Sequence, residues 1–457
     1  MRDKEEEREN GWKVCEREEG AKRPGGGHRE HVNTVRKICA FLSAFIFAFL
    51  FAAIPVSAHI PFYAHSNQAE STDSHQFTLQ IYGNANEDDT VDMRDVTYIK
   101  LVIFGKKPET EFCDANYDGK VSMLDVVQTK LIIVGKEAKL TIVDSADRTV
   151  TVKKPVRRIV PQPITLYEPI WVLGAQDKVV GVRTEAKEDD YPWLPGIQDI
   201  PAIGRRKDLD YEKIIELEPD IVIASKKAVE EIEEKLAPAG ITVVALQFVE
   251  IEKFDTEFKI LAKILGKDER AEEFISWRQK HLEMVKERTE GIESKVKVFG
   301  EYTDVEWGTG GKGSGLHSVI TAAGGYNIAG DEVGYFGIVD PEWVIRENPE
   351  VILLVEWTGL TGYYIDSYEG VKQLIENAYN RTGLKETDAV KNGRVYVIDG
   401  PGVLTACRSN IAVLYCAKWF YPEQFEDLNP EEVHREYFEE WIGVPYRGIW
   451  AYPLIGG

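Results

Sequence analysis

Two acidic loops lie thirty residues apart and carry oxygen-bearing side chains at matching positions. Oxygen ligands at loop positions 1, 3, 5 and 12, with a backbone carbonyl at position 7, can surround a Ca²⁺ ion. The residues at these positions are Asn84, Asn86, Asp88, Thr90 and Asp95 in the first loop, and Asp114, Asn116, Asp118, Lys120 and Asp125 in the second. The repeat therefore predicts two Ca²⁺ sites. The first is expected to bind more weakly, because Asn84 carries no charge where Asp114 carries one.

The sixth position of each loop must allow a sharp turn. Gly119 suits this position in the second loop, and Asp89 in the first loop tolerates left-handed backbone better than most residues. The alternative is an acidic turn that binds no ion. Two loops in register, each followed by an apolar run at 96–104 or 126–134, favour metal binding.

This repeat resembles a dockerin module, which is built of loop-plus-helix units with Asp at position 12 of each loop. The resemblance covers Ile81 to Lys136. It implies two bound Ca²⁺ ions, folding coupled to calcium, and binding to a cohesin on another protein. Cohesin contacts in the family fall at loop positions 10 and 11, which here are Met93, Arg94, Met123 and Leu124.

A second group of residues has the chemistry of a ligand-binding cleft. Aromatic side chains give flat apolar walls, and arginines bind carboxylates or anionic chelates through paired hydrogen bonds. The candidates, which follow expected strands or lie in loops, are Gln162, Tyr167, Arg205, Arg206, Trp307, Ser314, Tyr335, Trp357 and Arg408. After the N-terminal module, the chain holds only His281, His317 and His434. A metal carried inside an organic chelate is therefore favoured over a bare transition metal, which would need several imidazoles.

These residues must be positioned by two α/β segments with a long helix between them. Residues 267–295 contain no Pro and show an apolar stripe at helical spacing, so we expect about 22 helical residues here, roughly 33 Å long, with Asp268 as the N-cap. Short apolar strands alternate with helices on both sides, which indicates parallel sheets covered by helices. Expected strands are 140–144, 149–152, 158–160, 178–182, 220–224, 241–245, 296–301 and 394–398, and expected helices are 167–173, 211–217, 228–236, 318–323 and 410–420.

The segment from Gly204 to Ile223 carries a helix, the dipeptide Pro219-Asp220 and a strand, and residues 339–354 repeat this order. The chain from about Lys139 to Tyr446 resembles helical-backbone periplasmic binding proteins, which serve ABC importers of ferric siderophores, haem and cobalamin. The resemblance implies an α/β fold of two sheet-helix lobes joined by one long helix, here preceded by a small all-α calcium-loop module. It also implies a ligand in the cleft between the lobes, and a permease with its ATPase as partners. Acidic residues on each lobe meet permease arginines in this family, and Glu185, Glu188 and Asp189 are candidates in the first lobe.

The predicted organisation has five parts. They are residues 1–58, an N-terminus with a signal peptide or membrane anchor; 81–136, the calcium module; 139–266, the first lobe; 267–295, the connecting helix; and 296–450, the second lobe. Ile38 to Ala58 is apolar, follows Arg36-Lys37 and ends in a small-residue sequence. A cleaved signal and a retained anchor both place the rest of the chain outside the cytoplasm, as a secreted or N-terminally anchored protein.

Composition narrows the function. A net charge of −22 argues against nucleic acid and anionic membranes as partners. Five cysteines in 457 residues are too few for a disulfide framework, and Cys407 and Cys416 are expected to be core residues. The sequence lacks G-x-S-x-G, H-E-x-x-H and C-x-x-C motifs, so we predict a binding protein and not an enzyme.

The predicted function is capture of a metal chelate for an ABC importer. A ferric siderophore is expected first, and cobalamin or haem next, with a dockerin tethering the protein to a cohesin-bearing surface protein. The alternatives are a dockerin-borne carbohydrate-active enzyme and a surface scaffold that binds no ligand.

Overall fold

The structure is a computed structural model that describes residues 78–404 and 406–453. The predicted signal or anchor lies outside these residues. Residues 72–457 form one compact unit. The division of this unit into the calcium module, the two lobes and the connecting helix therefore stays a prediction. In the part of the chain that the structure describes, no helix is long and apolar enough to cross a bilayer.

The two acidic loops each lead into a helix of the same length. Helix α1 spans Met93–Ile103 and helix α2 spans Met123–Ile133. Asp92 caps α1 and Ser122 caps α2, and in both helices the Asp three residues later accepts the backbone N–H of the capping residue. The helices enclose a small core of Ala85, Val96, Ile99, Cys113 and Val126. The loop-plus-helix repeat in the sequence is therefore a repeat in the structure.

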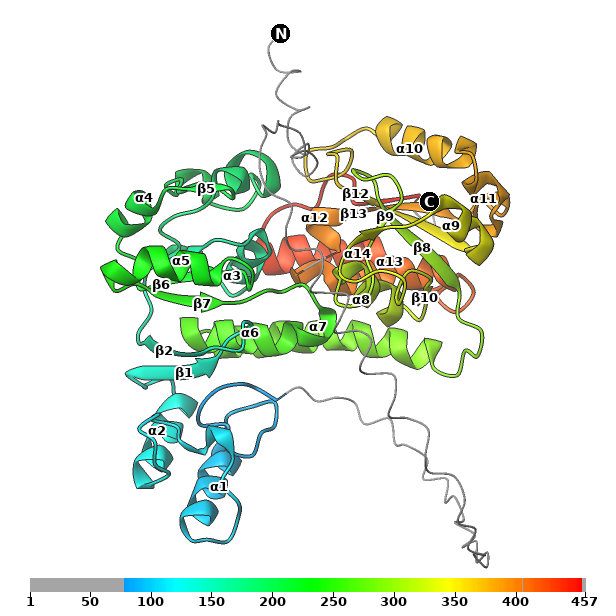
Figure 1. Cartoon of the computed structure of the whole chain (residues 1–457). Coiled ribbons are helices and arrows are strands. Elements are labelled where there is room, and N and C mark those ends of the chain that lie inside the picture. The colour runs from blue at the N-terminus through cyan, green and yellow to red at the C-terminus, as the bar shows by residue number, and fades with distance from the viewer. Residues whose placement is uncertain (1–77, 405, 454–457) are drawn as a thin grey trace, which may run out of the picture. The chain divides into compact units, whose positions relative to one another are not determined.

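This small module packs directly against the first lobe (Figure 1). Ile81 forms an antiparallel bridge with Ile142, and the N–H of Tyr82 donates to the carbonyl of Thr141 at 3.0 Å. Lys259 Nζ donates to the backbone carbonyl and a carboxylate oxygen of Asp89, at 2.8 and 2.7 Å. The module and the first lobe thus share backbone hydrogen bonds and a hydrophobic core.

The first lobe contains a parallel sheet with the strand order β3-β6-β7. Its strands are β3 (Ile159–Pro161), β6 (Ile221–Ala224) and β7 (Thr242–Ala245), and its helices are α3 (Tyr167–Val172), α4 (Tyr211–Glu216) and α5 (Val229–Leu236). Two hairpins pair β1 (Lys139–Val143) with β2 (Thr149–Lys153), and β4 (Gly204–Arg205) with β5 (Asp208–Leu209). The expected strand 178–182 forms only single bridges, at Val179 and Val182.

The second lobe is built on a five-stranded sheet with the order β10-β8-β12-β13-β14. Its strands are β8 (Lys297–Tyr302), β10 (Tyr326–Asn327), β12 (Val351–Glu356), β13 (Val395–Asp399) and β14 (Ala451–Tyr452), of which β14 alone is antiparallel. Its helices are α8 (Gly315–Ala322), α9 (Pro341–Glu347), α10 (Glu369–Asn380), α11 (Asp388–Lys391), α12 (Gly400–Val403), α13 (Ser409–Phe420) and α14 (Pro430–Glu436). A short ribbon pairs β9 (Gly308–Thr309) with β11 (Gly337–Ile338). Strands β12 and β13 are buried along their whole length, as expected for parallel strands covered on both faces.

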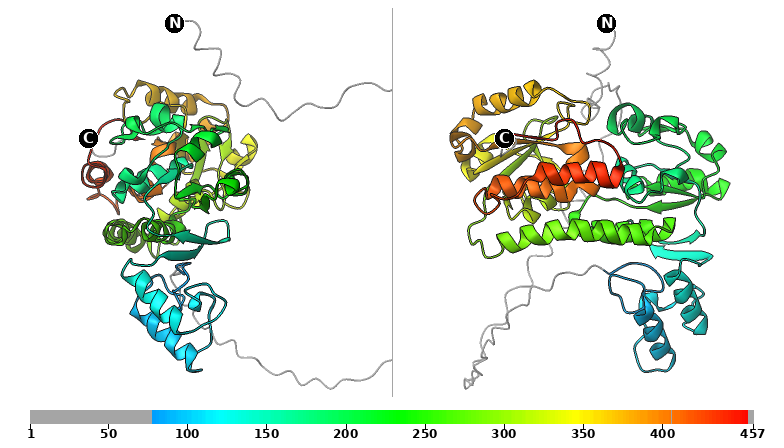
Figure 2. Two further views of the ribbon diagram at one scale, coloured as in Figure 1. Left: turned by 90° about the vertical axis from the view of Figure 1, so that its left-hand side faces the viewer. Right: turned by 180° about the vertical axis from the view of Figure 1, so that it is seen from behind.

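Helix α7 (Asp268–Thr289) is the predicted connecting helix, with 22 residues. It runs beside both lobes and packs against α6 (Ile251–Leu265) and α13 (Figure 2). Asp268 is not its N-cap: Lys267 occupies that position without a side-chain cap, and Asp268 pairs instead with Lys263 at 2.8 Å. The two α/β lobes and the long helix between them agree with the fold class expected from sequence.

Candidate functional site

A cavity of about 490 Å³ is lined by both lobes. Gln162, Arg183, Arg206 and Gln247 come from the first lobe, and Tyr335 comes from the second. The remaining lining residues are Pro163, Ile164, Thr165, Glu185, Ser225 and Val249. Gln162, Ser225 and Gln247 closely follow the carboxyl ends of β3, β6 and β7, where open parallel sheets bind ligands. The cavity is therefore the candidate ligand site, and its volume lies within the usual range of about 300–1,000 Å³.

The polar groups of this cavity favour an anionic ligand. Glu185 Oε1 accepts the backbone N–H of Arg206 at 2.9 Å, and its Oε2 lies 4.0 Å from Arg183 Nε, so the one carboxylate of the lining faces two arginines. Gln162 is buried, and its Oε1 has no hydrogen-bond partner among the described residues. Lys227 Nζ lies 5.1 Å from the ring centre of Tyr335, which adds a further cation near the second lobe. Guanidinium and amide groups thus dominate the cavity.

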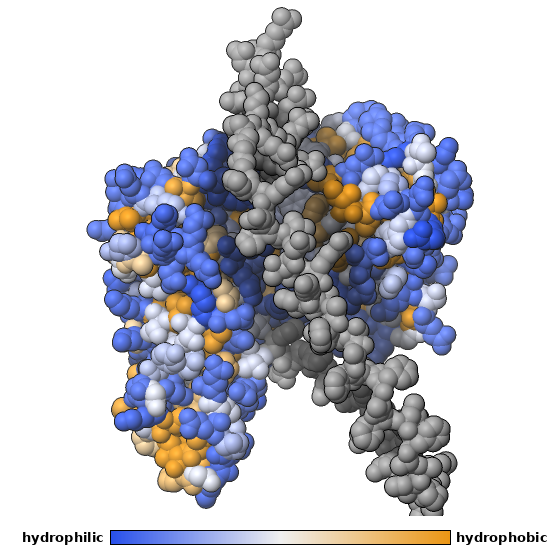
Figure 3. Space-filling model, in the orientation of Figure 1, coloured by the Kyte–Doolittle hydropathy of each residue, from blue (hydrophilic) through white to orange (hydrophobic). Residues whose placement is uncertain are grey.

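Four aromatic residues form a wall on the second lobe, which we call the aromatic wall: Tyr302, Tyr335, Phe336 and Trp357. The rings of Tyr302 and Phe336 stack at 6.0 Å, and Trp357 meets Tyr302 edge-on at 6.5 Å. Tyr335, Phe336 and Trp357 are 52%, 49% and 38% exposed, which is high for large aromatic side chains. Hydrophobic surface also gathers on the side of the second lobe that faces the first (Figure 3). The wall offers flat apolar area beside the polar cavity.

The structure brings Gln162, Arg206 and Tyr335 together in the cavity and places Trp357 on the adjoining wall. Residue types alone could not identify Ser225, Gln247 and Val249 as lining residues. For Ser225 and Gln247, the position shortly after a buried strand was the available signal.

Three candidate residues lie outside the lining of this cavity. Tyr167 is fully buried, and its hydroxyl bonds the backbone of Pro161 and Arg183. Ser314 is the N-cap of α8, where its Oγ accepts the N–H of His317 at 3.1 Å. Arg408 is 1% exposed and forms a two-point ion pair with Glu168, at 2.6 and 3.1 Å. Each of these side chains has a structural contact that accounts for it.

Two further candidates also lie outside the cavity lining. Arg205 is exposed on the β4–β5 hairpin and pairs with Glu188 at 2.5 Å. Trp307 packs under the guanidinium of Arg381, 4.2 Å from its ring centre, against the core of the second lobe.

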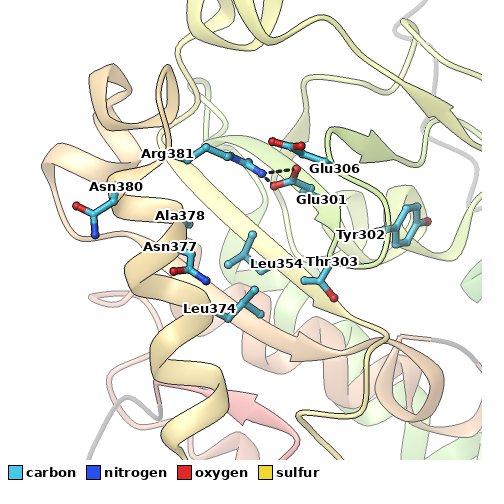
Figure 4. Close-up of a pocket in the computed structure, with 10 residues that line it drawn as sticks. All are labelled: Glu301, Tyr302, Thr303, Glu306, Leu354, Leu374, Asn377, Ala378, Asn380 and Arg381. Atoms are coloured by element: carbon cyan, nitrogen blue, oxygen red, sulfur yellow. Dashed lines mark hydrogen bonds and ion pairs between the residues drawn. The ribbon is translucent and has the colours of Figure 1, made fainter. Parts of the chain in front are cut away.

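A second cavity of about 340 Å³ lies within the second lobe, between its sheet and α10 (Figure 4). Arg381 and Glu301 form a two-point ion pair there, with distances of 2.9 and 2.5 Å. Asn377, Ala378 and Leu374 line it from α10. Arg381 and Glu301 already neutralise each other, Glu306 adds a second carboxylate, and the first lobe contributes no residue to the lining.

The acidic loops can be tested for a fit to Ca²⁺. The N–H groups of Asn86 and Asp92 donate to Asp95 at 3.0 and 2.8 Å, and the second loop repeats this pattern on Asp125. Asn84 donates through Nδ2 to the carbonyls of Leu79 and Asp88, while its buried Oδ1 has no partner in the described chain. This oxygen, with neighbouring carboxylate and amide oxygens, fits the hard donor set that Ca²⁺ prefers.

Two findings qualify this fit. Within residues 78–404 and 406–453, no three His, Cys, Asp or Glu side chains lie close enough together to hold a metal, so a cation would also need amide and backbone oxygens. Asp89 does not adopt the expected left-handed backbone, whereas Gly119 does, with φ of 85°. The first loop is held instead by Lys259 on Asp89 and by Arg94 on Asp88, at 2.7 and 3.0 Å.

The buried carboxyl group of Asp399 makes stability depend on pH. Burial raises the pKa of Asp399 to about 6 from 3.8, although Arg408 opposes the shift. The folded state then binds the proton more tightly, so this contribution is complete below pH 3.8 and is lost as the pH rises through about 6. Asp399→Asn removes the titration. We expect its stability relative to the wild type to improve by about 2.5 kcal/mol between pH 4 and pH 7.5. Urea unfolding at both pH values measures this change, and an equal difference at both would contradict it.

Comparison with known proteins identifies the family. The family described as periplasmic binding protein matches residues 168–401, more than half of the 457-residue chain. The chain belongs to the periplasmic binding protein family. It is similar to substrate-binding proteins of ABC transporters, which bind small molecules and work with a permease and its ATPase. It is therefore a solute-binding protein and not an enzyme.

The chain matches most of the length of each of two relatives. The uncharacterized ABC transporter substrate-binding lipoprotein YvrC of Bacillus subtilis (strain 168) is 28% identical over 300 residues, covering 63% of this chain and 87% of YvrC. The petrobactin-binding protein YclQ of the same organism is 24% identical over 284 residues, covering 57% and 80%. The first of these names gives no ligand, and the second gives petrobactin.

Solved structures show the same fold. The TroA-like periplasmic binding protein FepB from Veillonella parvula matches with a TM-score of 0.60 and 23% identity, covering 69% of this chain and 99% of that one. The Haemophilus influenzae protein MolA, bound to molybdate, matches with a TM-score of 0.56 and 20% identity, covering 67% and 99%.

Proposed function

We propose that this periplasmic binding protein captures an anionic metal chelate, a ferric siderophore first, for import by an ABC transporter. The observation that carries the proposal is the cavity between the lobes, with Arg183, Arg206 and Gln162 on one side and Tyr335 on the other. Guanidinium groups suit the carboxylate or catecholate oxygens of such a chelate, and the aromatic wall suits its flat organic parts. The name of the relative YclQ, a petrobactin-binding protein, supports this class of ligand.

Ligand size separates the candidates within this class. The cavity of about 490 Å³ lies in the lower half of the range for small-molecule sites, which favours a compact chelate over cobalamin or haem. Vitamin B12-binding proteins and a molybdate-binding protein also occur among the relatives, so both ligand types belong in the test.

Isothermal titration of the full chain tests this proposal. The titrants are ferric tris-catecholate, a ferric hydroxamate, haem, cobalamin and sodium molybdate. We expect saturable binding of a ferric chelate, with quenching of tryptophan emission. Binding of molybdate alone would replace the chelate with an oxyanion, and binding of none of the five would remove the proposal.

We further propose that the calcium-loop module tethers the protein to a cohesin-bearing partner through a Ca²⁺-dependent surface. Asn84, Asn86, Asp88, Thr90 and Asp95 would hold one ion, and the second loop would hold another through its matching residues. Met93, Met123 and Leu124 are 55%, 54% and 62% exposed at the positions that contact cohesin in dockerins. Figure 3 shows hydrophobic surface on this module.

The second loop is expected to bind Ca²⁺ more tightly than the first, and Asp114→Asn should remove this difference. The substitution gives the second loop the same uncharged residue that the first loop carries in Asn84. We expect Ca²⁺ affinity at the second loop to fall by about tenfold or more, because one charged ligand is lost. Calcium titration monitored by amide exchange in residues 114–133 measures the change. Unchanged affinity, or no ordering of the wild type by Ca²⁺, would count against the sites.

Two exposed glutamates occupy equivalent positions in the two lobes and are candidates for docking to the permease. Glu212 is the second residue of α4 and Glu342 is the second residue of α9, and each helix is capped by an Asp side chain. Of the candidates from sequence, Glu185 accepts the backbone N–H of Arg206, and Glu188 pairs with Arg205. The side chain of Asp189 lies outside the part of the chain that the structure describes.

Charge reversal at Glu212 and Glu342 to Lys is expected to lower uptake by tenfold or more while leaving chelate affinity within about twofold, because rim charges control association. Uptake in cells and titration in vitro provide the two readouts. Normal uptake by the double variant would exclude this surface.

A further inference from the structure

A buried carboxylate organises the loop that follows β12, the central strand of the second lobe. Glu356 is 1% exposed. Its Oε1 accepts the N–H of Thr358 at 2.5 Å, and its Oε2 accepts the N–H groups of Gly359, Leu360 and Thr361 at 3.2, 3.0 and 3.2 Å. Four consecutive backbone donors therefore converge on one side chain. The hydroxyl of Thr358 also donates to this carboxylate, and the hydroxyl of Thr361 lies 3.1 Å from it and 2.7 Å from Asp399 Oδ1.

This loop begins with Trp357, whose backbone and ring are both held by specific contacts. The N–H of Trp357 donates to Thr303 Oγ1 at 3.1 Å. A methyl group on Gly400 would lie 2.5 Å from the indole Nε1, so the ring lies directly on the backbone of Gly400. The Trp357 ring also packs edge-on against Tyr302 of the aromatic wall. The indole is thus fixed by its neighbours while 38% of the residue stays exposed.

We infer that Glu356 is a positioning residue for ligand capture. By holding residues 358–361, it keeps the Trp357 ring packed on Gly400 within the aromatic wall. The inference rests on the proposed function in one respect, since it takes the space beside this wall as the ligand site. No other side chain satisfies the four N–H groups in the described chain. Without the carboxylate these N–H groups would have no acceptor within the protein. The loop would then change conformation so that they could hydrogen-bond to water. Fixing the ring before the ligand arrives lowers the ordering cost of binding.

Hydrogen exchange of the unliganded full chain tests the loop directly. Glu356→Gln keeps the size of the side chain but turns one acceptor into a donor. We expect exchange at the amides of residues 358–361 to rise at least tenfold, with little change in the flanking strand β12. The matched control is Asp220→Asn, because Asp220 also accepts two backbone N–H groups, from Arg157 and Arg158 at 2.7 and 2.9 Å, but at the amino end of β6. Unchanged exchange at 358–361 in Glu356→Gln would overturn the inference.

A double-mutant cycle with ferric tris-catecholate tests whether Glu356 acts through Trp357. We expect Glu356→Gln and Trp357→Ala each to weaken binding about tenfold, the double variant to be no weaker than Trp357→Ala, and Asp220→Asn to bind like the wild type. Multiplicative losses in the double variant would contradict positioning and indicate separate roles. If ferric tris-catecholate fails to bind the wild type, the proposed ligand is wrong, and the exchange result, which needs no ligand, decides the positioning of the loop.

Discussion

Arg408→Ala is expected to lower the free energy of unfolding by about 3–5 kcal/mol, because it leaves a buried carboxylate without its partner. Arg408 joins the second lobe to Glu168 of the first, and Tyr437 donates to the same carboxylate at 2.6 Å. The guanidinium also lies 4.3 Å from the ring centre of Trp450. Equilibrium unfolding in urea measures the loss, with tryptophan emission as the signal.

A double variant separates the ion pair from the packing around it. Glu168→Leu with Arg408→Met removes both charges and keeps much of the buried volume, so we expect it to lose less stability than Arg408→Ala alone. A double variant that is less stable than Arg408→Ala would show that the pair itself, and not the unpaired charge, carries the stability.

Arg206→Gln is expected to weaken binding of an anionic chelate by about 10- to 100-fold, the range for loss of one charge-assisted hydrogen bond. Arg206 lines the cavity between the lobes. The neighbouring Arg205 is exposed, pairs with Glu188 and lies outside the lining, so Arg205→Gln is the matched control. Titration calorimetry with the same ferric chelate compares the two variants. Equal losses in both would show that the effect is general electrostatic attraction and not contact in the cavity.

Much of the fold could be predicted because its elements carry strong local patterns. The buried strands β6 and β13 are short apolar runs, and α7 has an uninterrupted helical stripe. Helix α6 was missed although it spans 15 residues, since its apolar face follows directly on the loop after β7 without a capping residue. The role of Asp268 differs from the expected N-cap, because Lys263 in the last turn of α6 pairs with its carboxylate.

The candidate site was harder to predict because it depends on contacts between distant segments. Gln162 and Tyr335 line one cavity although 172 positions separate them. Arg408 looked like a ligand residue because it is a lone arginine in a loop, and only the folded chain brings Glu168 to it. The carboxylate of Glu356 gives no sequence signal, since its partners are backbone N–H groups that any residue could supply.

The most direct test of the account is the position of iron in crystals of the loaded protein. Anomalous scattering at the iron edge locates the metal independently of the organic chelate. We expect one peak in the cavity lined by Gln162, Arg206 and Tyr335, with chelate oxygens and no protein side chain within about 2.3 Å of it. A peak outside this cavity, or iron held directly by side chains of the protein, would contradict capture of a metal chelate between the lobes.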